Sequence, residues 1–296
     1  MNAVAANTDQ KLEIRVFGDS SLPTLVYLPG LHGDWTLAES FRAAVAGRAR
    51  FIQLIYPRTL DWSMDTYTDA IEAILQAHDI SNGWLLGESF GSQFVWTLLE
   101  RQIEAHARGK SDVFRVDGAV LSGGFVKHPW SWGPRTLRRI GEKTSPGQYK
   151  RELGIYARYA KFRHRHAPET LASINEFVAR RTELDRQAMR HRLTLLDQYD
   201  PRPIARQARI PIHYIAGLID PLVPWPLVRR WLRRNCPGYL GGKTFWLADH
   251  NVLATAPRQS ADLILKWMRG APASSESISV RELATGVTPP PLPSNK

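Results

Sequence analysis

The stretch Gly87-Glu88-Ser89-Phe90-Gly91 decides the fold of this chain. It follows an apolar run at 84–86, which predicts a buried strand, and it precedes a segment at 92–100 whose apolar residues recur at helical spacing. A strand, a Gly-x-Ser-x-Gly turn and a helix together predict a nucleophile elbow, in which the serine is held in a strained backbone conformation. The two glycines are required because side chains there would collide with neighbouring backbone. An ordinary glycine-rich turn is the alternative, and the rest of the chain has to decide between them.

The segments on either side of the elbow alternate between strand and helix patterns, which predicts an α/β fold with a mostly parallel sheet and crossover helices. Strands are predicted at 11–17, 24–28, 50–56, 84–86, 117–121, 211–216 and 243–247, and helices at 35–46, 65–78, 92–100, 227–233 and 260–269. The alternation stops after Phe125, and only helical or irregular patterns follow until about Tyr199.

This break divides the chain into three parts. We predict a core made of residues 1–126 and 200–270, a helical insertion at 127–199, and a disordered tail at 271–296 that is rich in serine and proline. A proline-rich ligand for another protein is an alternative interpretation of the tail. Asp200, which precedes a proline, is interpreted as the turn through which the chain re-enters the sheet.

The net charge of +11 is concentrated in the insertion, because residues 127–192 contain 16 Lys and Arg against 6 Asp and Glu, a balance of +10. A solvated helical face is one interpretation of this charge, and attraction of an anionic substrate or transient contact with an anionic membrane surface is the other. Nucleic-acid binding fits poorly, because the charge lies where a lid is expected. The single cysteine, Cys236, excludes a disulfide framework. Without a signal-like start or a membrane-length apolar run, we expect a soluble, cytoplasmic protein.

A serine nucleophile needs a base, an acid that orients the base, and donors for the oxyanion. Ligands of a parallel sheet gather at the carboxyl ends of its strands, so we consider residues just beyond strand ends. Asp220 follows the strand at 211–216, and His250 follows the last strand. The chain order Ser89, Asp220, His250 is the one expected for a nucleophile elbow. Asp249 is interpreted as a loop carboxylate, because it is adjacent to the histidine in sequence.

Two backbone N–H groups are predicted to form the oxyanion hole. One belongs to Phe90, at the start of the helix that follows the elbow. The other lies in the loop Pro29-Gly30-Leu31-His32-Gly33, after the strand at 24–28. Leu31 is the preferred donor and His32 the alternative, because the His-Gly pair can be aligned in two ways.

In these motifs the chain resembles the α/β-hydrolase superfamily, from about residue 12 to residue 268. The resemblance implies an eight-stranded, mostly parallel sheet with a helical cap inserted after the sixth strand, where 127–199 falls. Two positions depart from the common pattern: Glu88 stands where many members carry His, and Pro29 precedes Gly30 where many carry His-Gly. The matching segments are Leu28-Pro29-Gly30-Leu31-His32-Gly33, Gly87-Glu88-Ser89-Phe90-Gly91, Gly217-Leu218-Ile219-Asp220 with Val223-Pro224, and Asp249-His250-Asn251-Val252-Leu253.

The resemblance and the residues together predict a serine hydrolase that cleaves a carboxylic ester or thioester through an acyl-enzyme. The substrate is expected to be a small acyl compound, anionic or lipid-like, and neither a cofactor nor a metal ion is expected. An acyltransferase with the same three residues is the first alternative, and a non-catalytic binding protein on the same scaffold is the second. A serine at the elbow, where an aspartate would be needed, argues against dehalogenase or epoxide hydrolase chemistry.

Overall fold

The computed structural model of the protein describes residues 11–130, 132–143, 145–163, 165 and 167–270. At its centre these residues form a seven-stranded sheet with the order β1-β3-β2-β4-β5-β6-β7. β1 is antiparallel to β3, and every other neighbouring pair is parallel. The eight strands that the resemblance implied are wrong for the described chain, whose seven strands equal the number of strand patterns in the sequence. The strands are β1 Glu13–Phe17, β2 Thr24–Leu28, β3 Arg50–Ile55, β4 Asn82–Glu88, β5 Arg115–Ser122, β6 Ile212–Gly217 and β7 Tyr239–Phe245.

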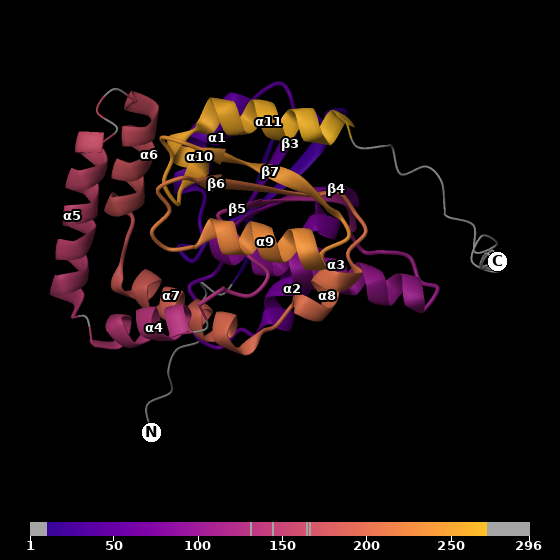
Figure 1. The fold of residues 1–296 in the computed structure, drawn as a ribbon, viewed down its shortest axis with the longest axis horizontal. Helices are drawn as coiled ribbons and strands as arrows, with labels where there is room; N and C mark the ends of the chain where they lie inside the picture. The colour runs from indigo at the N-terminus through magenta and orange to yellow at the C-terminus, as the bar shows by residue number, and fades with distance from the viewer. Residues whose placement is uncertain (1–10, 131, 144, 164, 166, 271–296) are drawn as a thin grey trace, which may run out of the picture.

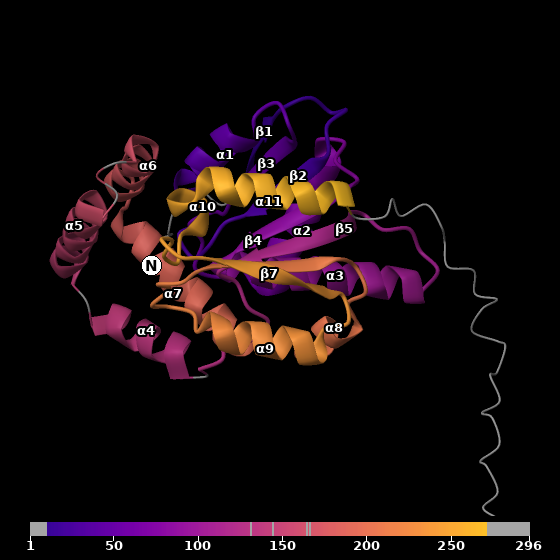
Figure 2. The ribbon, with the colours of Figure 1, turned by 45° about the horizontal axis from the view of Figure 1, so that its top comes forward.

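Helices cover both faces of this sheet, which explains why consecutive apolar residues occupy the middle of its central strands, as at 84–86 in β4. On one face lie α1 (Glu39–Val45) and α11 (Pro257–Gly270), and on the other lie α2 (Met64–Ala77), α3 (Ser92–Ala107) and α9 (Trp225–Asn235) (Figures 1 and 2). Two hydrophobic clusters fill the two interfaces. Because β2 to β7 are parallel, their carboxyl ends lie together at one edge of the sheet.

Of the helices that the structure describes between β5 and β6, four lie beyond that edge, at the left of Figure 1. They are α4 (Trp132–Lys143), α5 (Pro146–Arg163), α6 (Pro168–Ala179) and α7 (Glu183–Gln198). The segment thus follows β5, the fifth strand, and the predicted position after a sixth strand is wrong, because the described sheet has one strand fewer than expected. At its base, Lys127 Nζ donates to the carbonyls of Leu196, Asp197 and Tyr199, which satisfies the free carbonyls at the end of α7. The segment's two ends are thereby joined.

Some boundaries differ from those predicted. β7 runs from Tyr239 to Phe245 and not over 243–247, and Trp246 and Leu247 are 77% and 82% exposed beyond its end. A glycine pair such as 241–242 usually interrupts a strand, but here Gly242 pairs with Tyr214 inside β7. A Cβ on Gly242 would lie 2.1 Å from the Tyr214 carbonyl oxygen, so this position in the strand requires glycine.

The helix predicted at 35–46 is a 3-10 turn, η1 (Thr36–Ala38), followed by α1. Other short helices were not predicted: the 3-10 turn η2 (Ser89–Gly91) precedes α3, and α10 (Val252–Thr255) precedes α11. After Asp200 the chain forms α8 (Arg202–Gln207) before it re-enters the sheet, and the Asp200 carboxylate accepts hydrogen bonds from Arg202 at the start of this helix. The predicted tail at 271–296 lies outside the described residues. In the described part of the chain, no helix is long and apolar enough to span a membrane.

Candidate active site

Ser89 stands at the turn between β4 and α3 in a left-handed backbone conformation, with φ of +50°. Such a conformation is strained for a residue other than glycine. Glycine is required on both sides, because a Cβ on Gly91 would lie 2.0 Å from the Leu28 carbonyl oxygen, and one on Gly87 would lie 2.8 Å from the Cα of Ser92. The turn therefore holds Ser89 at the carboxyl edge of the sheet, at the start of α3.

His250 and Asp220 come from the loops that follow β7 and β6, and they meet at the same edge. His250 Nδ1 lies 2.8 Å from Asp220 Oδ2, and the Asp220 side chain is fully buried. The other carboxylate oxygen of Asp220 accepts the backbone N–H groups of Leu222 and Val223, both at 2.9 Å. Burial alone would lower the pKa of His250, but the hydrogen bond and charge of Asp220, together with the charges of Glu88 and Asp249, outweigh it, and the pKa is raised above its ordinary value.

Asp249 takes no part in this pair. Its Oδ1 accepts the N–H of Asn251 at 2.9 Å in a tight turn beside the histidine. His213 lies within β6, stacked on Trp267 at 4.2 Å, and burial lowers its pKa to about 4. These placements leave His250 as the histidine that pairs with the loop aspartate.

The loop after β2 passes directly beside Ser89. A Cβ on Gly30 would lie 3.5 Å from the Cβ of Ser89, an ordinary contact distance, so the Gly30 backbone lies next to the Ser89 side chain. A turn closes the loop, with the N–H of Gly33 donating to the Gly30 carbonyl at 3.0 Å. Phe90 follows Ser89 in η2, with its ring buried against Tyr56 and Phe94, so its backbone is the part that faces the turn.

A cavity of about 240 Å³ joins these groups, since Ser89, His250 and Leu31 all line it. The helices of the 127–199 segment cover it, with Leu153 from α5, Phe177 from α6 and Met189 from α7. Leu37, Leu222 and Asn251 complete its wall together with Gly30, His32 and Glu88. No lysine or arginine in the described part of the chain lines this cavity.

Glu88 and His32 form a second histidine–carboxylate pair at the cavity. Glu88 is 1% exposed, and its Oε2 accepts a hydrogen bond from the Tyr27 hydroxyl at 2.5 Å. His32 Nε2 lies 3.7 Å from the same oxygen, beyond hydrogen-bond distance. Burial lowers the pKa of His32 although Glu88 and Asp34 oppose this, so the ring is neutral at pH 7. The sequence showed that Glu88 is unusual at its position but contained no sign of Tyr27 as its partner.

Two arginines of the 127–199 segment also reach this site, and their role was not predicted. Arg192 of α7 is 1% exposed, and Arg181, between α6 and α7, has a fully buried side chain. Both donate to backbone carbonyls of the loop after β2. The sequence could have indicated that Arg192 is buried, because its helical spacing places it on the same face of α7 as Asp185, Ala188 and Leu195, which are all buried.

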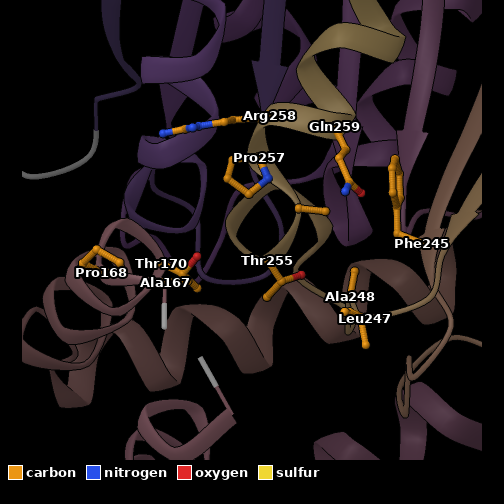
Figure 3. A pocket seen from close by; sticks show the side chains of 11 residues that line it. Ala167, Pro168, Thr170, Phe245, Leu247, Ala248, Thr255, Pro257, Arg258 and Gln259 are labelled. Carbon is orange, nitrogen blue, oxygen red and sulfur yellow. The ribbon is translucent and has the colours of Figure 1, made fainter. Parts of the chain in front are cut away.

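A larger cavity, of about 520 Å³, lies between the start of α11 and the start of α6 (Figure 3). Pro257, Arg258 and Gln259 form one side of it, and Pro168 and Thr170 the other. The Thr170 hydroxyl donates to the Ala254 carbonyl at 2.7 Å. Because this cavity contains no nucleophile beside a base, chemistry and not size selects the smaller one as the candidate active site. Within the described ranges, no group of three or more His, Cys, Asp or Glu side chains is arranged to hold a metal ion.

Comparison with known proteins gives a family-level match over much of the chain. Residues 47–252 match the sequence model of a family described as the alpha/beta hydrolase fold. No curated protein matches the sequence.

Solved structures with a similar fold include several enzymes. An enol-lactonase from Burkholderia xenovorans LB400 shares 17% identity, with 87% of this chain and 96% of that chain covered and a TM-score of 0.67. The esterase RhEst1 from Rhodococcus sp. ECU1013 also shares 17% identity, with 88% and 95% covered and a TM-score of 0.68. A bromoperoxidase from Bacillus anthracis shares 15% identity, with 87% and 95% covered and a TM-score of 0.66. At these identities the likeness concerns the fold.

Proposed function

This chain belongs to the α/β-hydrolase family, and we propose that it is a serine hydrolase that cleaves a carboxylic ester or thioester. In this proposal Ser89 is the nucleophile, His250 the general base and Asp220 the residue that orients His250. The backbone N–H groups of Leu31 and Phe90 bind the oxyanion. The observation that carries the proposal is the juxtaposition, around one cavity, of a serine at φ of +50° and a histidine hydrogen-bonded to a buried aspartate.

The chemistry follows from which atoms are free to react. Because Nδ1 of His250 is bonded to Asp220, Nε2 is the nitrogen that accepts the proton from the Ser89 hydroxyl as its oxygen attacks the carbonyl carbon. The carbonyl oxygen becomes negative and is stabilised by the Leu31 and Phe90 amides. His250 then returns the proton to the leaving alcohol or thiol. Water, deprotonated by His250 in the same way, attacks the acyl-enzyme and releases the acid.

The cavity wall supports an apolar acyl group of a few carbons. Leucine, phenylalanine and methionine side chains dominate it, and its volume of about 240 Å³ lies below the 300–1,000 Å³ or so typical of sites for drug-sized ligands. The positive charge of the insertion does not reach the cavity wall in the described residues. Any preference for an anionic substrate would therefore act at long range, through attraction towards the entrance.

The test is a panel of p-nitrophenyl esters, from acetate to decanoate, together with the matching acyl thioesters. We expect turnover that falls as the chain lengthens, and loss of that turnover in Ser89→Ala. Ser92→Ala is a matched control. Ser92 lies three residues further on, and its hydroxyl donates to the carbonyls of Ser89 and Phe125, so it is not free to attack a substrate. Equal turnover in Ser89→Ala and the wild type would refute the proposed nucleophile.

The same panel distinguishes water from an alcohol as the acyl acceptor. With glycerol or methanol added, a hydrolase forms mainly the free acid, whereas an acyltransferase forms mainly the new ester. A dominant new ester would replace the hydrolase with the acyltransferase that shares its three residues. Ester hydrolysis absent from wild type and variants alike would instead favour a binding role for the scaffold.

A further inference from the structure

Three successive carbonyl groups of the loop after β2 are held by hydrogen bonds. The Gly30 carbonyl accepts the N–H of Gly33 at 3.0 Å, within the loop. The Leu31 carbonyl accepts Nη1 of Arg192 at 2.7 Å. The His32 carbonyl accepts Nη1 of Arg181 at 3.3 Å. Two of the three donors therefore come from the segment that covers the cavity.

Arg192 joins α7 to two loops of the sheet edge. While Nη1 binds the Leu31 carbonyl, Nη2 donates to the Pro57 carbonyl at 2.8 Å, so one guanidinium spans both loops. Its charge faces the ring of Tyr56, at 5.5 Å from the centroid. A Cβ on Gly33 would lie 2.7 Å from Nη1, so the loop carries glycine where Arg192 enters. Lysine has a single nitrogen and lacks this planar pair of donors.

Arg181 anchors the end of the same loop through a buried charge pair. Its Nη2 binds the Asp34 carboxylate, and its Nε donates to the Phe177 carbonyl at 3.0 Å. The other Asp34 oxygen accepts the hydroxyl of Thr36 at 2.6 Å, where η1 begins. Burial would raise the pKa of Asp34, but the pKa is lowered overall, because Arg181 and the Thr36 hydroxyl favour the carboxylate.

These bonds determine where the Leu31 N–H points. In a trans peptide the carbonyl and the following N–H point in opposite directions, so the Gly30–Gly33 turn directs the Leu31 N–H away from the turn. Arg192 holds the next peptide through the Leu31 carbonyl. Both peptides that flank the Leu31 Cα are thus held, and one of the two depends on an arginine of α7.

We infer that Arg192, assisted by Arg181, is a positioning residue for the oxyanion hole, and that the hole is complete only while α6 and α7 are docked on the loop. The inference rests on the proposed function, in which the Leu31 N–H binds the oxyanion. Neither arginine lines the cavity. Arg192 acts through the Leu31 carbonyl, and Arg181 acts through the His32 carbonyl and the Asp34 carboxylate. Separation of the covering helices from the sheet edge would release the loop and stop catalysis with Ser89, His250 and Asp220 unchanged.

Variants at Arg192 test this inference through kinetics. We expect Arg192→Met to lower kcat on the order of 10²-fold, the loss typical of one misplaced oxyanion donor, with little change in KM. Arg192→Lys, which preserves the charge and one donor, should fall between Met and the wild type. The control is Arg135→Met in α4. The exposed Arg135 guanidinium pairs with Asp197, and its replacement should change kcat by no more than about twofold.

A tetrahedral inhibitor separates positioning from general damage. A boronic acid bound to Ser89 carries an oxygen in the oxyanion position, so its affinity should fall in Arg192→Met by about the same factor as kcat. The affinity of a ground-state ligand, such as the product acid, should stay within a few-fold. Equal losses for the boronic acid and the product acid would overturn the inference and assign Arg192 a structural role only.

Hydrogen–deuterium exchange of the peptide covering residues 28–36 provides a readout that needs no activity. We expect faster exchange in this peptide in Arg192→Met and Arg192→Lys, and unchanged exchange in Arg135→Met. Unchanged exchange in the Arg192 variants would overturn the inference even if Ser89 proves to be the nucleophile. Faster exchange in a protein without esterase activity would instead refute the proposed function while leaving the loop contact in place.

Discussion

His250 and His32 both line the cavity beside Ser89, and each faces a buried carboxylate. His250 Nδ1 lies 2.8 Å from Asp220, at hydrogen-bond distance, whereas His32 Nε2 lies 3.7 Å from Glu88, beyond it. The pKa values move in opposite directions from the ordinary value of 6.5. Burial opposes a charge on both rings, but Asp220 overcomes it and raises the pKa of His250, whereas Glu88 fails to do so and the pKa of His32 is lowered.

The difference explains why His250, and not His32, is the proposed base. A hydrogen bond to a carboxylate stabilises the imidazolium that forms when the ring takes a proton. The Asp220 carboxylate is itself held by two backbone N–H groups, so it is oriented towards His250. Glu88 is oriented towards the Tyr27 hydroxyl, and this leaves His32 as a neutral ring that packs edge-on against Phe177 at 5.7 Å. Three substitution experiments test this contrast through activity, with the largest expected effect first, and urea unfolding then tests it through stability.

Exchange of each histidine for alanine gives the largest expected contrast. His250→Ala removes the proposed base and should lower kcat/KM on the order of 10⁴- to 10⁶-fold. His32→Ala should lower it by no more than about tenfold, through loosened packing of the loop. Both are measured with p-nitrophenyl acetate on protein whose circular dichroism matches the wild type. If the order of the two losses were reversed, the base would be misassigned.

Asp220→Asn tests what raises the pKa of His250. The amide removes the charge that offsets burial, so the pKa of His250 should fall, and with it the pH below which activity is lost. We expect kcat/KM to decrease on the order of 10³- to 10⁴-fold, with the acidic limb of its pH profile displaced to lower pH. An unmoved limb would mean that Asp220 does not control the protonation of His250.

The sequence predicted the positions of residues that follow a strand, and it missed contacts that depend on which side chains meet in the folded protein. Ser89, Asp220 and His250 each follow a strand, so the pattern of strands alone brought them to one edge. The pairing of Glu88 with Tyr27 connects two neighbouring strands through side chains, and no periodicity encodes it. The eighth strand came from the family pattern and not from the residues. Within the insertion, the charge count treated all arginines alike, although Arg192 is buried and Arg158 is exposed.

Glu88→Gln is expected to have a smaller effect than Asp220→Asn. The amide oxygen still accepts a hydrogen bond from the Tyr27 hydroxyl, so the packing behind Ser89 is preserved while the charge is lost. Glu88 contributes less than Asp220 to raising the pKa of His250, so the acidic limb should move slightly to lower pH. We expect a decrease in kcat/KM of about tenfold or less. A loss as large as that of Asp220→Asn would place Glu88 in direct contact with the reacting groups.

The last contrast is in stability, because the two histidines should respond to pH with opposite signs. The pKa of His32 is lowered by folding, so its contribution is complete above 6.5 and is lost as pH falls through the folded-state pKa. The pKa of His250 is raised by folding, so its contribution is complete below 6.5 and is lost as pH rises through the folded-state pKa.

Urea unfolding of the wild type, His32→Gln and His250→Gln between pH 5 and pH 8 measures these signs. The free-energy cost of His32→Gln should be larger at pH 8 than at pH 5, and that of His250→Gln larger at pH 5 than at pH 8. Each unit of pKa difference between the folded and unfolded protein corresponds to about 1.4 kcal/mol. Because all other titrating groups are common to the three proteins, their effects cancel in the differences. If the free-energy costs of His32→Gln and His250→Gln varied with pH in the same direction, the pKa values of the two histidines would not be shifted in opposite directions by folding.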